Sequence, residues 1–164
     1  MQESSYRKLS HFMLSKPLFA KFWEILGKAI TICAYILYPI LLVALFFTNK
    51  SALLRIFLVT AVSFIVLSVI RKIINAPRPY EKFDIPSLYH KATRGNSFPS
   101  RHTFSVFIIA LSVLWLDLIF GIVLLLLAVL LAISRVLCGL HFIKDVIVGA
   151  VFALVCYLIG YIIL

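Results

Sequence analysis

About five apolar stretches, each close to the length of a membrane-spanning helix, constrain this chain more than any other feature. A spanning helix needs about 20 mostly apolar residues, because the hydrocarbon core is ~30 Å thick and each helical residue rises ~1.5 Å. Lipid offers the backbone no hydrogen bonds, so such segments must satisfy their own polar groups as helices. The stretches cover residues 29–47, 52–70, 102–116, 118–137 and 145–163. We therefore expect an all-α, polytopic membrane helix bundle with about five transmembrane helices.

The composition also favours a multi-pass protein of the cell membrane. Hydrophobic residues make up 63% of the 164-residue chain, against roughly 45–50% in soluble globular domains. The net charge is +10, and the basic residues lie in polar segments between the apolar stretches, so lipid headgroups or a phosphorylated substrate fit better than nucleic acid. Cys33, Cys138 and Cys156 have no spacing typical of a metal site or a disulfide framework. The pattern does not indicate an oligomeric state.

The N-terminal 28 residues differ in pattern from the rest of the chain. Residues 9–28 mix large apolar side chains with Lys16, Lys21, Glu24 and Lys28, which is typical of an amphipathic helix lying in the membrane interface. We therefore divide the chain into an amphipathic, interfacial segment at residues 1–28 and a transmembrane domain at residues 29–164.

Residues 71–101 form a long polar connection between the second and third apolar stretches. Its helix-breaking residues are Pro77, Pro79, Pro86, Gly95 and Pro99. Polar connections of this length are uncommon unless they are functional. Two apolar stretches separate it from the polar junction at residues 138–144, so both segments are expected on the same membrane surface.

The strongest chemical motif combines Ser134-Arg135 with His141 and Asp145, where one apolar stretch ends and the next begins. His141 and Asp145 are four residues apart, so on a helix they would project from the same side and the carboxylate could accept an imidazole N–H. Such a contact fixes one tautomer and leaves the other ring nitrogen as nucleophile or base. An interfacial His–Asp cap without a catalytic role explains this motif, taken alone, equally well.

Two further motifs lie at the ends of apolar stretches. The segment Ser-Phe-Pro-Ser-Arg-His at residues 97–102 directly precedes an apolar helix, so Ser100 is expected as its N-cap, with an anion bound at the first turn beside His102. Arg71 and Arg78 are seven residues apart, so on a helix they would share a face and could hold phosphate oxygens. Taken singly, an ordinary helix start and headgroup anchoring explain these motifs better.

Together the three motifs resemble the signature of the type 2 phosphatidic acid phosphatase family, to which lipid phosphatases and vanadium-dependent haloperoxidases belong. That signature is Lys, six residues, Arg-Pro; then Pro-Ser-Gly-His; then Ser-Arg, five residues, His, three residues, Asp. The matching positions here are Arg71, Arg78, Pro79, Pro99, Ser100, Arg101, His102, Ser134, Arg135, His141 and Asp145. Three motifs in this order are far more specific than any one of them.

The resemblance implies a phosphatase that uses neither a metal nor another cofactor. His141 would attack phosphorus to give a phosphohistidine, His102 would protonate the leaving oxygen and later activate water, and Asp145 would orient His141. The side chains expected to hold the phosphoryl oxygens are Arg71, Lys72, Arg78, Ser100, Arg101, Ser134 and Arg135. Carboxylates are too scarce around this basic site for a two-metal cage.

The chain departs from the family pattern at two motif positions. Arg71 stands where the family has lysine, with Lys72 adjacent, and either side chain could fill that role. Arg101 replaces the family glycine, which adds positive charge but removes the smallest residue from the helix start. Family members often have six spans, whereas this chain keeps the five that carry the motifs and has an amphipathic segment in place of the first.

Two other functions stay open at this point, namely a vanadate-dependent haloperoxidase and a non-catalytic protein that binds or transports lipid phosphates. The apolar body argues for a lipid substrate, and two histidines with Asp145 argue for catalysis. Phosphatidic acid, phosphatidylglycerophosphate and isoprenyl diphosphates all fit as substrates. The side of the membrane is also open, because the positive-inside rule indicates the cytoplasm, whereas bacterial family members commonly work on the outer face.

Overall fold

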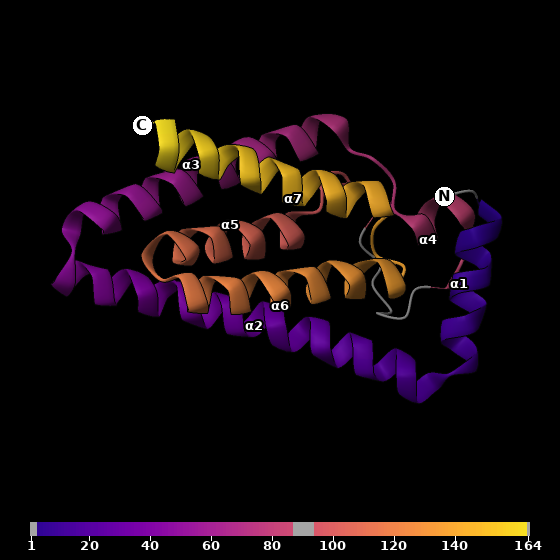
Figure 1. The fold of residues 1–164 in the computed structure, drawn as a ribbon. Coiled ribbons are helices and arrows are strands. Elements are labelled where there is room, and N and C mark those ends of the chain that lie inside the picture. Colours follow the sequence, from indigo (N-terminus) through magenta and orange to yellow (C-terminus); the bar gives the residue numbers. More distant parts are fainter. Residues whose placement is uncertain (1–2, 87–93, 164) are drawn as a thin grey trace.

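The computed structural model describes residues 3–86 and 94–163, and every regular element in these ranges is a helix. The helices are α1 (Glu3–Ser15), α2 (Pro17–Thr48), α3 (Lys50–Ile74), α4 (Pro79–Phe83), α5 (Arg101–Leu116), α6 (Leu118–Leu137) and α7 (Ile143–Leu158), followed by a π-helical turn (Ile159–Ile163). In Figure 1, α5 runs through the middle of the bundle, with α2 and α6 on one side and α3 and α7 on the other. The short helix α1 lies across one end. The expected all-α fold is confirmed.

Four helical segments are long and apolar enough to cross a membrane, namely Pro17–Thr48, Lys50–Phe83, Leu118–Leu137 and Ile143–Tyr161. The fifth expected span, α5, has only 16 residues. It therefore rises about 24 Å, less than the ~30 Å of a hydrocarbon core. Asp117 ends α5 and begins α6, where its side chain accepts the backbone N–H of Phe120 at 2.9 Å. Four of the about five expected spans thus correspond to helices long and apolar enough to cross a membrane, and α5 is a shorter, mostly buried helix.

The expected helix boundary near the N-terminus was wrong. No separate amphipathic helix covers residues 9–28, because α1 ends at Ser15 and α2 continues unbroken past residue 28. Pro17 begins α2 at a position where its missing N–H is not needed. Glu24 and Lys28 form an ion pair of 2.6 Å one turn apart on α2. Such a pair stabilises a continuous helix, so the charged residues do not end it.

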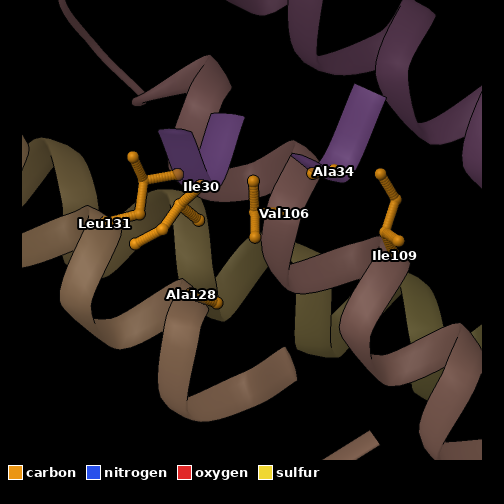
Figure 2. Packing of buried hydrophobic residues seen from close by; sticks show 6 residues of the cluster. All are labelled: Ile30, Ala34, Val106, Ile109, Ala128 and Leu131. Carbon is orange, nitrogen blue, oxygen red and sulfur yellow. The ribbon is translucent and has the colours of Figure 1, made fainter. Parts of the chain in front are cut away.

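Two clusters of buried apolar side chains fix α5 in the bundle. The cluster between α2, α5 and α6, shown in Figure 2, contains Ile30, Ala34, Val106, Ile109, Ala128 and Leu131. The cluster between α3, α5 and α7 contains Leu67, Phe104, Ile108, Leu111 and Ala153. Alanines at these contacts let the helix backbones approach closely. The outward faces of the long helices are also apolar, with Ile32, Ile36 and Ile40 of α2 exposed, as a lipid-facing surface requires.

Candidate active site

His141 and Asp145 face each other at the junction between α6 and α7. The junction turns at Gly139, whose φ of +71° favours glycine, and the backbone N–H of His141 donates to the carbonyl of Arg135 at 3.3 Å. Asp145 lies in the first turn of α7. The Nδ1 atom of His141 is 3.5 Å from Oδ2 of Asp145, and the side chains are 2% and 0% exposed. The pair is therefore buried together.

Ser97 is a third member of this cluster; the second motif begins at this residue, but no role was predicted for it. Its Oγ donates a 2.5 Å hydrogen bond to Oδ2 of Asp145 and lies 3.4 Å from Nδ1 of His141. The same carboxylate oxygen accepts the backbone N–H of Phe142 at 3.0 Å. The only signal in the sequence is the position of Ser97 as the first residue of the 97–102 segment.

The polar connection and the α6–α7 junction meet here, as the order of the apolar stretches predicts. The backbone N–H of Ser100 donates to the carbonyl of Asp145 at 2.8 Å. Gly149 lies against the same residue, because a Cβ on Gly149 would come within 2.7 Å of the Ser100 carbonyl oxygen. His102, the second residue of α5, is therefore carried on a helix whose start is joined to α7. The Ser100 hydroxyl accepts a 3.0 Å hydrogen bond from Thr103.

Arg71 supports the connection from the end of α3. Its buried guanidinium donates to the backbone carbonyls of Asn96, Ser97 and Pro99, with a distance of 3.3 Å to Ser97. Its neighbour Lys72 is exposed. In this structure Arg71 thus shapes the segment that carries Ser97 and leads into α5.

Two more arginines bring positive charge to this end of the bundle. Nε of Arg78 donates to the carbonyl of Gly95 at 3.2 Å. Arg101 is exposed, and its guanidinium lies 5.7 Å from the centre of the Phe64 ring on α3. Burial lowers the pKa of His141 from 6.5 to about 4. The contact with the Asp145 carboxylate offsets only part of this effect, and the charges of nearby arginines add to it. The imidazole is therefore neutral at physiological pH.

Ser134 and Arg135 are positioned by hydrogen bonds to α2. The Ser134 hydroxyl donates to the carbonyl of Trp23 at 3.0 Å. Nη2 of Arg135, which is 3% exposed, donates to the Thr31 hydroxyl at 2.7 Å and lies 3.4 Å from the Gly27 carbonyl. These contacts fix α6 against α2 beneath the junction.

The aromatic side chain of Tyr6 covers the outer side of this junction. Its hydroxyl accepts the backbone N–H of Ile143, the first residue of α7, at 3.0 Å. Its ring packs edge to face on Phe142 at 5.2 Å and lies 5.9 Å from Phe83 of α4. Burial raises the pKa of Tyr6, so the hydroxyl stays protonated. The sequence motifs gave no indication of this contact from α1.

The donor set at the site is basic rather than metal-binding. Within residues 3–86 and 94–163, no three His, Cys, Asp or Glu side chains lie together as they would to hold a metal ion. The charges of Arg71 and Arg78 act on His141, and Lys82 and Lys144 line a cavity beside Asp145. Guanidinium groups match phosphate oxygens with paired hydrogen bonds. The arrangement suits an anionic ligand with an imidazole beside it.

Known proteins share both the sequence pattern and the fold. The PAP2 superfamily profile matches residues 52–164. Aquifex aeolicus LpxE is 27% identical with a TM-score of 0.74, over 93% of this chain and 92% of that one. A transmembrane PAP2 type phosphatidylglycerolphosphate phosphatase from Bacillus subtilis is 24% identical with a TM-score of 0.71, over 96% of this chain and 83% of that one, and shares the fold. No curated protein sequence matches the chain. The chain belongs to the PAP2 superfamily, as its three motifs indicate.

Proposed function

We propose that this chain is a multi-pass membrane hydrolase that removes a phosphate group from a lipid phosphate or diphosphate, without a metal ion, through a phosphohistidine on His141. The observation that carries this proposal is the buried His141–Asp145 pair, joined through Ser100 to the helix start that bears His102. A basic surface that only bound or transported lipid phosphates would need no such pair. The pair therefore favours catalysis.

His141 is the nucleophile in this mechanism. With the Nδ1 proton directed at Asp145, Nε2 holds the lone pair that attacks phosphorus. The N–P bond forms as the P–O bond to the lipid breaks, and His102 gives a proton to the departing oxygen. Water, deprotonated by His102, then attacks phosphorus, breaks the N–P bond and releases inorganic phosphate. The lowered pKa of His141 supports this role, because the neutral ring can attack directly.

The phosphoryl oxygens are assigned to Arg78, Arg101 and the first turn of α5, where backbone N–H groups and the helix dipole favour an anion. Fixed positive charge there stabilises the transition state in place of the magnesium that other phosphoryl-transfer enzymes use. Arg71 contributes by shaping the loop, as its three carbonyl partners indicate. Arg135 contributes by joining α6 to α2, as its contact with Thr31 indicates.

A lipid substrate is supported by an apolar cavity of ≈ 290 Å³ between α2, α3 and α5. Phe104, two residues after His102 on α5, forms part of its wall, and so does Phe64, over which Arg101 lies. An acyl or prenyl chain in this cavity would leave its phosphate near the start of α5. An apolar wall of this kind would not contribute to the binding of a soluble haloperoxidase substrate.

We further propose that α1 and the first turns of α2 lie at the headgroup level. Lys16, Lys21 and Lys28 fall in this region, where basic side chains contact anionic lipids. Arg7 of α1 donates to the carbonyl of Phe83 at 2.9 Å, which holds α1 at the same end as the site. The N-terminal segment and the active site would then share one membrane surface.

Phosphate release from a panel of lipids tests the proposed function. The purified protein in detergent is given phosphatidic acid, phosphatidylglycerophosphate or an isoprenyl diphosphate, with EDTA present throughout. Phosphatidylglycerophosphate is included because the Bacillus subtilis protein is named for it. We expect release from at least one of these lipids and inhibition by vanadate, which mimics pentacoordinate phosphorus. Loss of activity in EDTA with rescue by magnesium would overturn the metal-independent mechanism, and no release from any lipid would overturn the activity.

A further inference from the structure

Ser97 lies between the two residues of the proposed catalytic pair. Its side chain is fully buried, with Oγ 2.5 Å from Oδ2 of Asp145 and 3.4 Å from Nδ1 of His141. The direct distance from Nδ1 to Oδ2 is 3.5 Å, long for a hydrogen bond. The serine oxygen is thus as close to the imidazole as the carboxylate is.

The directions of these hydrogen bonds follow from the donors available. An ionised carboxylate can only accept hydrogen bonds, so the Ser97 hydroxyl donates its one proton to Asp145. Its oxygen can then only accept hydrogen bonds from other neighbours. Both neighbours of Nδ1, the Ser97 oxygen and Oδ2, are then acceptors. The neutral ring satisfies them by carrying its proton on Nδ1, which leaves the lone pair on Nε2.

The backbone of Ser97 is fixed from both sides. Its N–H donates to the carbonyl of Ala76 at 2.8 Å, and its carbonyl accepts from Arg71 at 3.3 Å. Oδ1 of Asp145 is buried and has no hydrogen-bond partner among the residues that the structure describes. The contacts of the carboxylate therefore converge on Oδ2, and without Ser97 this oxygen would keep the Phe142 N–H and the long contact to His141.

We propose that Ser97 is a positioning residue that orients the His141–Asp145 pair and holds the His141 proton on Nδ1. This inference rests on the proposed function. As the N–P bond forms at Nε2, positive charge develops on the ring and the Nδ1 proton is drawn to Oδ2. Ser97 keeps that proton and that oxygen aligned while the bond forms, and it does not touch the phosphate.

The test compares Ser97→Ala with Ser97→Thr, which restores the hydroxyl, and with Ser112→Ala. Ser112 is also fully buried and hydrogen-bonded, but its partners are Ile108 and Tyr161, on α5 and in the C-terminal π-helical turn. For Ser97→Ala we expect kcat to fall about 10- to 100-fold, the range seen when partners that orient ligating histidines are removed, with KM nearly unchanged. Ser97→Thr should recover part of kcat, and Ser112→Ala should keep the wild-type kcat.

A second measurement is independent of activity. Nitrogen NMR of labelled histidine in detergent should show His141 with its proton on Nδ1 in the wild type, and a mixture of tautomers in Ser97→Ala. An unchanged tautomer or an unchanged kcat in Ser97→Ala would overturn the role of Ser97, as would an equal loss of kcat in Ser112→Ala. If wild-type protein released no phosphate from any lipid, the proposed function would fail, while the tautomer measurement would still decide the role of Ser97.

Discussion

The backbone N–H of Ser100 donates a 2.8 Å hydrogen bond to the carbonyl oxygen of Asp145. This contact joins the start of α5, which carries His102, to the first turn of α7. Gly149 makes the approach possible, because a Cβ there would lie 2.7 Å from the carbonyl oxygen of Ser100. The spacing of the two histidine-bearing segments thus depends on a glycine outside the three motifs.

Gly149→Ala should force α7 away from α5. Helix propensity alone favours alanine by about 1 kcal/mol, whereas overpacking against a backbone atom costs ~1–3 kcal/mol. We expect a lower Tm in detergent and phosphate release reduced ~10- to 100-fold, since small displacements of reacting groups are costly. Ile147→Ala changes the exposed face of the same helix and serves as the control. A Gly149→Ala protein with wild-type Tm and activity would contradict this contact.

Arg71 and Lys72 should differ sharply in their effect on stability. Arg71→Met leaves the buried carbonyls of Ser97 and Pro99 without their donor, and each buried acceptor left unpaired costs ~1–3 kcal/mol. Arg71→Lys keeps the charge but lacks the planar guanidinium with its several donors, so it should restore only part of the lost stability. Lys72→Met removes an exposed side chain and should leave the Tm unchanged. A larger loss from Lys72→Met than from Arg71→Met would assign the supporting role to the lysine.

Arg135 and Thr31 should be energetically coupled. The two side chains share a 2.7 Å hydrogen bond between α6 and α2, and buried hydrogen bonds to charged groups contribute ~1.5–3 kcal/mol. A double-mutant cycle with Arg135→Met and Thr31→Val, measured by thermal unfolding in detergent, should give a coupling energy of ~1 kcal/mol or more. Additive effects would show that Arg135 points elsewhere in solution.

The stability of the protein should fall as the pH falls from 6.5 to about 4, because the folded state holds the pKa of His141 at the lower value. The unfolded chain takes up a proton at this residue before the folded protein does, so acid favours unfolding. His141→Gln cannot titrate and should lose less Tm over the same interval. Parallel Tm curves for wild type and His141→Gln would contradict a buried neutral imidazole.

The two histidines should respond differently to the leaving group. His141→Ala should abolish turnover of every substrate, while phosphate still binds to the arginines. His102→Ala should cost ~10²–10⁴-fold on a lipid whose alkoxide must be protonated as the bond breaks. On an aryl phosphate the loss should be smaller, because a phenolate departs with little help. Equal losses of activity on both substrates would indicate that His102 acts in the hydrolytic step. Turnover by His141→Ala would exclude the covalent intermediate.

Local spacing explains what could be predicted from the sequence. His141 and Asp145 are close because they are only four positions apart, but not by the expected helical spacing, since His141 lies before the start of α7. The long apolar stretches indicate the helices directly. The direction of Arg135 could not be predicted, because it depends on Thr31, which is 104 residues away. The contact of Ser97 with Asp145 was not predicted for the same reason, since the two residues are 48 positions apart. The start of α2 was missed because charged side chains that end a hydrophobic stretch do not end a helix.

The contact between Tyr6 and Ile143 has a consequence for how the protein is made. The residues are separated by 137 positions, and domains generally acquire structure in the order of synthesis. Tyr6 leaves the ribosome well before Ile143, which is the first residue of α7. The turn that holds His141 can be completed only after α7 has emerged, so a partly synthesised chain in the membrane has no assembled His141–Asp145 pair.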